Sequence, residues 1–194
     1  MKESKSEKIL DAASYLFSSK GYAQTSIKEI SEYVGIHKST IFHYFKNKEE
    51  ILSDILKNSA YSATNNLKQS LLSNRNKDPV ERLRLAIYAH VKSIDFHLND
   101  VKVYLKEVDS LSDENKALYL EYRKRYQNDI EEIIKDVQKT GIFKGMNSKI
   151  VAFGILGMWN WLSVWYNKEG PFDPEIIADT FFKMLISDDH NRQQ

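Results

Sequence analysis

The sequence contains no cysteine, and only three prolines and seven glycines occur among its 194 residues. The absence of cysteine excludes disulfides and thiolate chemistry, and it fits a reducing compartment. Helix breakers are rare, and leucine, isoleucine, lysine and glutamate recur at helical spacing, which favours an all-α fold. No sustained period-two pattern predicts a strand, so we expect no sheet.

Neither sign of charge dominates, because 28 Lys and Arg nearly balance 27 Asp and Glu. Any affinity for nucleic acid must therefore come from a local patch of charge. The start of the chain, MKESKSEK, is charged and is not followed by the apolar core of a signal peptide, so a cytoplasmic protein is expected.

Long hydrophobic runs are also scarce. Residues 150–167 carry no charge and reach the lower limit of length for a membrane span. Two glycines, Asn160 and Ser163 interrupt this run, and the sequence offers no second span. We therefore expect a buried helix and no membrane partner.

Signatures of catalysis are missing as well. The sequence has no Gly-x-Ser-x-Gly elbow, no phosphate loop and no Glu-x-x-His pair, so no enzyme, no catalytic residue and no cofactor is expected. His90 and His97 lie two turns apart on one expected helix, but no partner is placed by sequence to complete a metal shell. A structural or ligand-binding role for these histidines is favoured over a metal site.

The most informative segment is HKSTIFHYFKNKEEIL, residues 37–52. Ile41 and Phe45 stand four residues apart and share one face of an expected short helix. The opposite face offers a hydroxyl, an exposed ring and an imidazole, from Ser39, Phe42 and His43. Lysines flank this face and no acidic residue lies between positions 33 and 48, which suits a phosphate backbone.

Residues 27–44 fit a helix-turn-helix template. Gly35 falls in the turn, where a positive φ is often needed. Ser26 and Glu29 form a capping box for the first of the two helices, and a preceding helix ends near Gly21. Apolar side chains fall where the two crossed helices bury them, at Ile30, Val34, Ile36, Ile41 and Tyr44. Three short helices therefore form a compact headpiece.

The run from residue 9 to residue 52 resembles the amino-terminal domain of the TetR family of transcriptional regulators, which is all-helical and dimeric. Its Lys-Gly-Tyr, its Thr-Ser-Ile, the Gly35 turn and the Tyr-Phe pair at 44 and 45 stand at the family's spacing. Phe42 stands where the family often has Tyr, and His37 where it often has Ser. A phenylalanine loses one phosphate hydrogen bond but keeps apolar contact with a thymine methyl.

The resemblance implies which residues contact DNA. Three are assigned to base edges: Ser39, Thr40 and Phe42. Seven are assigned mainly to phosphates: Thr25, Ser26, His37, Lys38, His43, Tyr44 and Lys48. A core contact for the Tyr44 ring remains an open alternative. Because a homodimer places two such helices about 34 to 36 Å apart, double-stranded DNA with an inverted-repeat operator is the expected partner.

We expect a helix-turn-helix domain over 1–48 and a larger ligand-binding and dimerisation domain over 49–194. An apolar stripe predicts a long connecting helix over 49–73. Further helices are expected over 80–98, 101–109, 113–139, 148–167 and 174–187. The last two carry too many large rings for one small core, so pairing with a second copy is favoured over packing within one subunit.

The pattern GMWNWLSVWYNKEGPFDPEIIADTF and the helix before it resemble a carboxy-terminal subclass of TetR-like proteins that includes acyl-CoA-responsive regulators of fatty-acid and sterol breakdown. The expected pocket is lined by rings, with arginines for an anionic group at its mouth: Phe96, Tyr104, Tyr122, Tyr126, Trp161, Trp165, Arg123 and Arg125. Each ring taken singly also suits a core. The resemblance implies a repressor released by a small hydrophobic effector such as an acyl-CoA. A multidrug-type inducer and a helical protein-interaction adaptor stay open as alternatives.

Overall fold

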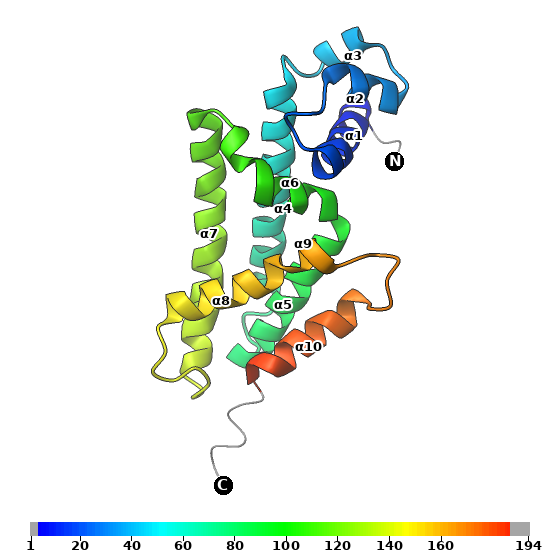
Figure 1. Cartoon of the computed structure of the whole chain (residues 1–194). Coiled ribbons are helices and arrows are strands. Elements are labelled where there is room, and N and C mark those ends of the chain that lie inside the picture. The colour runs from blue at the N-terminus through cyan, green and yellow to red at the C-terminus, as the bar shows by residue number, and fades with distance from the viewer. Residues whose placement is uncertain (1–3, 187–194) are drawn as a thin grey trace. The chain divides into compact units, whose positions relative to one another are not determined.

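The computed structural model describes residues 4–186, which form helices and short connections with no strand in that range (Figure 1). The all-α prediction is therefore confirmed. The helices are α1 (Lys5–Lys20), α2 (Ile27–Val34), α3 (Lys38–Phe42), α4 (Lys48–Ser73), α5 (Pro79–Phe96), α6 (Leu98–Glu107), the 3-10 turn η1 (Val108–Ser110), α7 (Asp113–Gln138), α8 (Ser148–Asn160), α9 (Leu162–Trp165) and α10 (Pro174–Ile186).

Packing divides the chain into two units. The first comprises Met1–Tyr61 with His97–Glu121, and the second Ser62–Phe96 with Tyr122–Gln194. Helices α4 and α7 contribute residues to both units. The expected functional boundary between residues 48 and 49 stays a prediction, because these units describe packing and not function.

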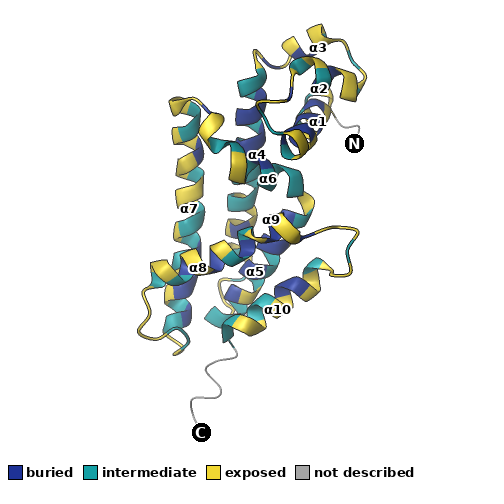
Figure 2. Cartoon of the chain, viewed as in Figure 1, coloured by how far each residue is buried: buried dark blue, intermediate teal, exposed yellow. Residues whose placement is uncertain are grey.

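The buried residues of the first unit form a core that includes Ile41 of α3 (Figure 2). Helix α1 packs against α2 and α6, and α2 packs against α3. Each fully buried large aliphatic side chain in this core stabilises the fold by roughly 1.5 to 3 kcal/mol. The buried set includes Ile9, Ala13, Phe17, Ile30, Ile41, Phe45, Ile51, Leu52, Val103 and Tyr119.

Local chemistry fixes the ends of the first helices. The Ser26 hydroxyl accepts a hydrogen bond from the Glu29 N–H while the Glu29 carboxylate accepts one from the Ser26 N–H, which confirms the predicted capping box. Helix α1 ends at Gly21, whose φ of 94° is accessible to glycine at little cost. An unpredicted second capping box, of Ser4 with Glu7, begins α1.

In the second unit, α10 packs along α5 (Figure 1). The Tyr88 hydroxyl on α5 donates to the Glu175 carboxylate of α10 at 2.6 Å. The Arg82 guanidinium pairs with Asp136 of α7 at 2.9 Å. The buried side chains of this unit come from α4, α5, α7, α8, α9 and α10, and include Leu67, Leu83, Ile87, Ile133, Trp159, Leu162 and Ile177.

Two predictions about helices are corrected. The expected single helix over 148–167 breaks at Trp161 into α8 and α9, and the Ser163 hydroxyl there donates to the Asn160 carbonyl, a local bond that competes with a continuous helix. On α7, the helical spacing of the sequence predicts that Leu118 faces inward, but Leu118 is 37% exposed, whereas Tyr119 is 1% exposed. Tyr119 takes the inward place because its ring packs on Tyr104, with centroids 5.2 Å apart.

The ends of the last helices also bear on the predictions. Helix α10 ends at Ile186, and residue 187, where we expected the helix to end, lies outside the described residues. Among the helices of residues 4–186, none combines the length and the apolar character needed to cross a bilayer.

Candidate nucleic-acid interface

The segment of α3 and the turn after it presents two distinct faces, as the sequence predicted, although α3 itself ends at Phe42 and is shorter than expected. Ile41 of α3 and Phe45 beyond its end are buried in the core of the first unit. On the other side, Ser39, Phe42 and His43 are exposed. Because the inner pair anchors the helix, the outer side chains stand free of the core and are available to a partner.

The turn before α3 depends on Gly35. This residue ends α2 in the left-handed conformation, with φ 75° and ψ 36°. The Ile36 N–H donates to the Ser31 carbonyl at 2.9 Å, which closes the helix end. Ser31 is buried and its hydroxyl donates to the Lys28 carbonyl at 2.8 Å, so a small polar residue is accommodated where the two helices approach.

Positive charge and aromatic surface adjoin on α3. The Lys38 ammonium lies 5.7 Å from the centre of the Phe42 ring. His37 precedes the helix, is exposed, and forms no side-chain cap bond to it. Thr40 is half-buried, and Tyr44 is 45% exposed, so the tyrosine ring is not a core residue of this unit.

Lys48 has a structural role that its sequence position did not reveal. Its ammonium donates to the carbonyls of Tyr22 at 2.7 Å and Thr25 at 2.8 Å. The same group lies 4.2 Å from the centre of the Tyr22 ring. Burial lowers the pKa of Lys48, while Glu107 and Glu29 act in the opposite direction. Lys48 therefore ties the start of α4 to the loop between α1 and α2.

Thr25 and Ser26 differ in exposure although they are neighbours. Thr25 is buried and its hydroxyl donates to the Gly21 carbonyl at 2.9 Å, so this side chain serves the loop. Ser26 is exposed at the amino end of α2. The Ser26 N–H donates to the Glu29 carboxylate, and the Lys20 ammonium lies 3.0 Å from that carboxylate. Together they hold the pKa of Glu29 down at about 2.

The comparisons with known proteins agree with this geometry. Residues 9–55 match the family model of bacterial regulatory proteins of the tetR family. Residues 76–188, more than half of the chain, match the model of the tetracyclin repressor-like C-terminal domain. The chain belongs to the TetR family. Members of this family are transcriptional regulators and not enzymes, and they bind DNA.

Individual TetR-family relatives are distant but cover nearly the whole chain. The repressor KstR2 of Mycobacterium tuberculosis is 22% identical over 180 residues, which is 92% of this chain and 89% of the relative. The fatty acid metabolism regulator of Bacillus subtilis is 24% identical over 193 residues, with 98% of each chain covered. The crystal structure of AibR in complex with isovaleryl coenzyme A and operator DNA is 27% identical, with a TM-score of 0.78, covering 94% of this chain and 98% of that one.

Three carboxylates link elements of the first unit of this TetR-family chain: two join the headpiece to α6, and the third joins the start of α4 to the start of α7. The Ser14 hydroxyl of α1 donates to Asp100. The Tyr22 N–H donates to Glu107 at 3.1 Å. Glu49 accepts from the Ser112 N–H at 2.9 Å, and bonds from Ser112 and Asn115 lower its pKa. Helix α3 therefore belongs to a packed unit that also includes α6.

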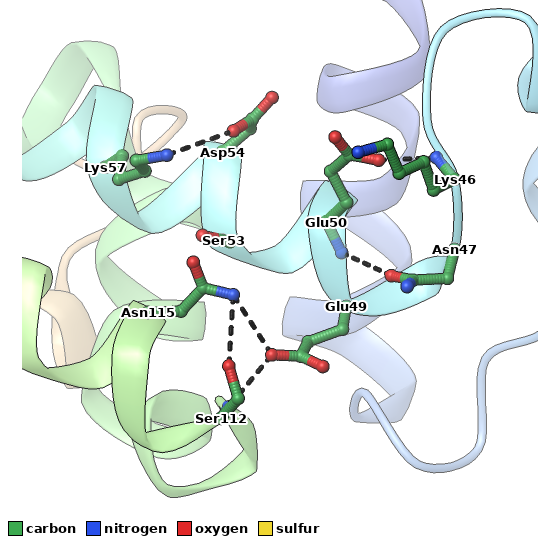
Figure 3. Close-up of a pocket in the computed structure, with 9 residues that line it drawn as sticks. All are labelled: Lys46, Asn47, Glu49, Glu50, Ser53, Asp54, Lys57, Ser112 and Asn115. Atoms are coloured by element: carbon green, nitrogen blue, oxygen red, sulfur yellow. Dashed lines mark hydrogen bonds and ion pairs between the residues drawn. The ribbon is translucent and has the colours of Figure 1, made fainter.

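A polar cavity of about 250 Å³ lies in the first unit beside Glu49 (Figure 3). Asn47 caps the start of α4, since its side-chain oxygen accepts a hydrogen bond from the Glu50 N–H at 2.8 Å. Asp54 pairs with Lys57 at 3.8 Å, and burial raises its pKa. None of the eight side chains that the sequence assigned to a ligand lines this cavity.

Those eight side chains lie in different surroundings. Tyr104 belongs to the first unit and packs on Tyr119, whereas the other seven belong to the second unit. In the second unit, the Arg125 guanidinium lies 6.0 Å from the centre of the Tyr122 ring, and Tyr126 contacts His90. The rest are exposed: Phe96, Arg123, Trp161 and Trp165. Their assignment to an effector stays a prediction.

The sequence pattern did not assign Trp159, which precedes Trp161 and Trp165, to the ligand site. Trp159 is fully buried and packs on the His90 ring, with centroids 4.7 Å apart. His90 was expected to serve a structural or ligand-binding role. Within residues 4–186 no group of three or more His, Cys, Asp or Glu side chains is placed to hold a metal ion.

Proposed function

We propose that this TetR-family protein is a cytoplasmic, dimeric repressor that binds an inverted-repeat operator and is released by a small hydrophobic effector. The observation that carries the proposal is the polar and aromatic outer face of α3, held by buried Ile41 and Phe45. Such a face has no structural task within the first unit, and it suits the major groove.

The proposed DNA contacts follow the outer face. Ser39, Thr40 and Phe42 contact base edges, the last through a thymine methyl. The phosphate contacts are Thr25, Ser26, His37, Lys38, His43, Tyr44 and Lys48. Thr25, which is 1% exposed, and Lys48 act chiefly by holding the loop that carries Ser26.

Exposed apolar side chains support the proposed dimer. They gather on the closing helices of the second unit: Ile150, Phe153, Trp161, Val164, Ile176 and Met184. A Cβ added at Gly154 or Gly157 would meet no atom within 4 Å, so another helix has room to approach α8 closely. Exposed apolar side chains on these helices favour an interaction site, and a twofold axis suits a palindromic operator.

The proposed effector is an acyl-CoA thioester. Support comes from two relatives: one is a fatty acid metabolism regulator, and the other has a crystal structure in complex with isovaleryl coenzyme A and operator DNA. An inducer of the multidrug type is the alternative. In either case the effector acts because it binds better to a conformation that does not fit DNA.

The proposal is tested with labelled DNA from upstream of the protein's own reading frame, by fluorescence anisotropy. We expect binding at least 1,000-fold tighter than to bulk competitor DNA, as is typical for specific regulators. Addition of isovaleryl-CoA or octanoyl-CoA should release the DNA, whereas free coenzyme A should not. A protein that binds the upstream fragment no better than competitor DNA is not the proposed repressor.

The salt dependence of operator binding separates two lysines. Lys38→Ala should reduce the slope of log affinity against log salt by about two per dimer, because each subunit loses one phosphate contact. Lys48→Ala should lower the melting temperature and the affinity but change the slope less, since its ammonium is engaged by two carbonyls. The exposed Lys46→Ala variant is the control for loss of a nearby charge. If Lys38→Ala leaves the wild-type slope, or reduces it no more than Lys46→Ala does, the proposed orientation of α3 on the DNA backbone is wrong.

A further inference from the structure

Three helices of the second unit bring a histidine, a tyrosine and a tryptophan together in its interior. His90 of α5 is 9% exposed and Trp159 of α8 is 0% exposed. The Tyr126 hydroxyl of α7 lies within hydrogen-bond distance of His90 Nδ1. The imidazole also packs on the indole ring, with centroids 4.7 Å apart.

Two ring nitrogens of this cluster form no hydrogen bond to the described residues. His90 Nε2 and Trp159 Nε1 are inaccessible to solvent, and neither has a hydrogen-bond partner among the described residues. Buried polar groups are nearly always paired in folded proteins, so each unpaired one calls for an explanation.

The protonation states of the cluster define what it recognises. Burial lowers the pKa of His90 to about 3, so the imidazole is neutral at pH 7. Burial also raises the pKa of Tyr126, which keeps its hydroxyl as a donor. When Tyr126 donates to Nδ1, the remaining imidazole proton resides on Nε2. The indole N–H is a donor in every case, so the cluster offers two donors and no charge.

We propose that Trp159 Nε1 and His90 Nε2 bind the carbonyl oxygen of the effector's acyl group between α5, α7 and α8. This inference rests on the proposed function, and it assigns the polar anchor of that effector. A cation is excluded because an indole N–H has no lone pair to offer it. A free carboxylate is disfavoured because the neutral imidazole supplies no compensating charge in a buried place. An uncharged carbonyl, as in a thioester, meets both requirements.

The test compares thioesters with analogues that lack only the carbonyl oxygen. Isothermal titration of the full-length protein uses isovaleryl-CoA against S-(3-methylbutyl)-CoA, and octanoyl-CoA against S-octyl-CoA. We expect the wild type to bind at least one thioester tenfold or more tightly than its thioether, because a site built to bond an oxygen rejects the analogue without it. In Trp159→Phe that preference should be reduced, because only the His90 donor remains, while thioether binding changes little.

Other outcomes overturn the inference. Equal binding of thioester and thioether by the wild type means that a buried water or nothing at all satisfies the two nitrogens. An equal loss of both ligands in Trp159→Phe means that the tryptophan contributes only shape. This wild-type comparison needs no variant, so it holds even if Trp159→Phe fails to fold.

The operator assay keeps this inference separate from the proposed function. If neither thioester binds although the wild type still binds its operator, the carbonyl anchor is wrong and the DNA-binding part of the proposal stands. If thioesters release the operator but the thioethers do so equally well, the proposed regulatory function is supported and the proposed contact to the carbonyl oxygen is wrong. Tyr126→Phe adds a readout of positioning, because it should weaken the thioester preference while leaving Trp159 in place.

Discussion

Ile150→Asp is expected to convert the proposed dimer to monomers and to lower operator affinity by about 100-fold or more, since two linked half-sites gain roughly that factor from avidity. Ile150 lies on α8 and is 70% exposed in the single chain, so a carboxylate there costs the isolated fold little. In the proposed interface the same carboxylate is buried near its twofold mate without a counter-charge, which is strongly unfavourable. Sedimentation equilibrium measures the oligomeric state, and anisotropy measures operator affinity.

Leu72→Asp is the matched control for Ile150→Asp. Leu72 lies on α4, outside the closing helices, and is 55% exposed. The same chemical change there should leave the protein dimeric and its operator affinity within about threefold of wild type. The two variants should melt near the wild-type temperature after correction for dimerisation. A dimeric Ile150→Asp protein with full operator affinity would place the interface elsewhere.

The parts of the interface that the sequence predicted are those set by short-range chemistry. The capping box of Ser26 and Glu29 involves residues three apart. The positive φ at position 35 is one that glycine adopts at little cost. The alternation that buries Ile41 and exposes Phe42 follows from helical geometry alone. Nothing beyond the segment itself was needed to foresee them, and all are confirmed.

The role of Lys48 shows where such reasoning stops. Its position suits a phosphate contact, but its ammonium reaches the carbonyls of Tyr22 and Thr25, which are more than twenty residues earlier in the chain. A backbone carbonyl leaves no mark in the sequence, so no motif announces that it will accept a bond. The same holds for Thr25, whose hydroxyl turns inward to Gly21.

The buried cluster of the second unit was out of reach for a related reason. His90, Tyr126 and Trp159 come from three helices, and spacing along any one helix says nothing about which rings meet. A helical pattern also fits the sequence nearly as well when it is shifted by one residue. This is why Leu118 was predicted to face inward, whereas Tyr119 does so. Packing between helices decided both cases, and it depends on side-chain volume and not on pattern.

Acidification should destabilise the wild type through His90 by roughly 3 to 5 kcal/mol between pH 6.5 and pH 3. Burial lowers the pKa of His90 from 6.5 to about 3, so in that window the unfolded chain binds a proton that the folded chain does not. Stability therefore falls as pH decreases, by about 1.4 kcal/mol per unit, and above pH 6.5 this residue adds no pH dependence. Urea unfolding at fixed protein concentration, at pH 7.5, 6, 5 and 4, measures the free energy of unfolding.

The double variant His90→Leu/Tyr126→Phe isolates the histidine, because it removes the imidazole and also the hydroxyl that would otherwise lose its partner. Carboxylates such as Glu29, whose pKa is held at about 2, lose their contribution on acidification in both proteins and cancel in the comparison. We expect the difference in unfolding free energy between wild type and variant to shift by about 2 to 3 kcal/mol in the variant's favour from pH 6 to pH 4. A constant difference across that range would mean that His90 is protonated in the folded protein, and the neutral donor that the effector site requires would then not exist below pH 6.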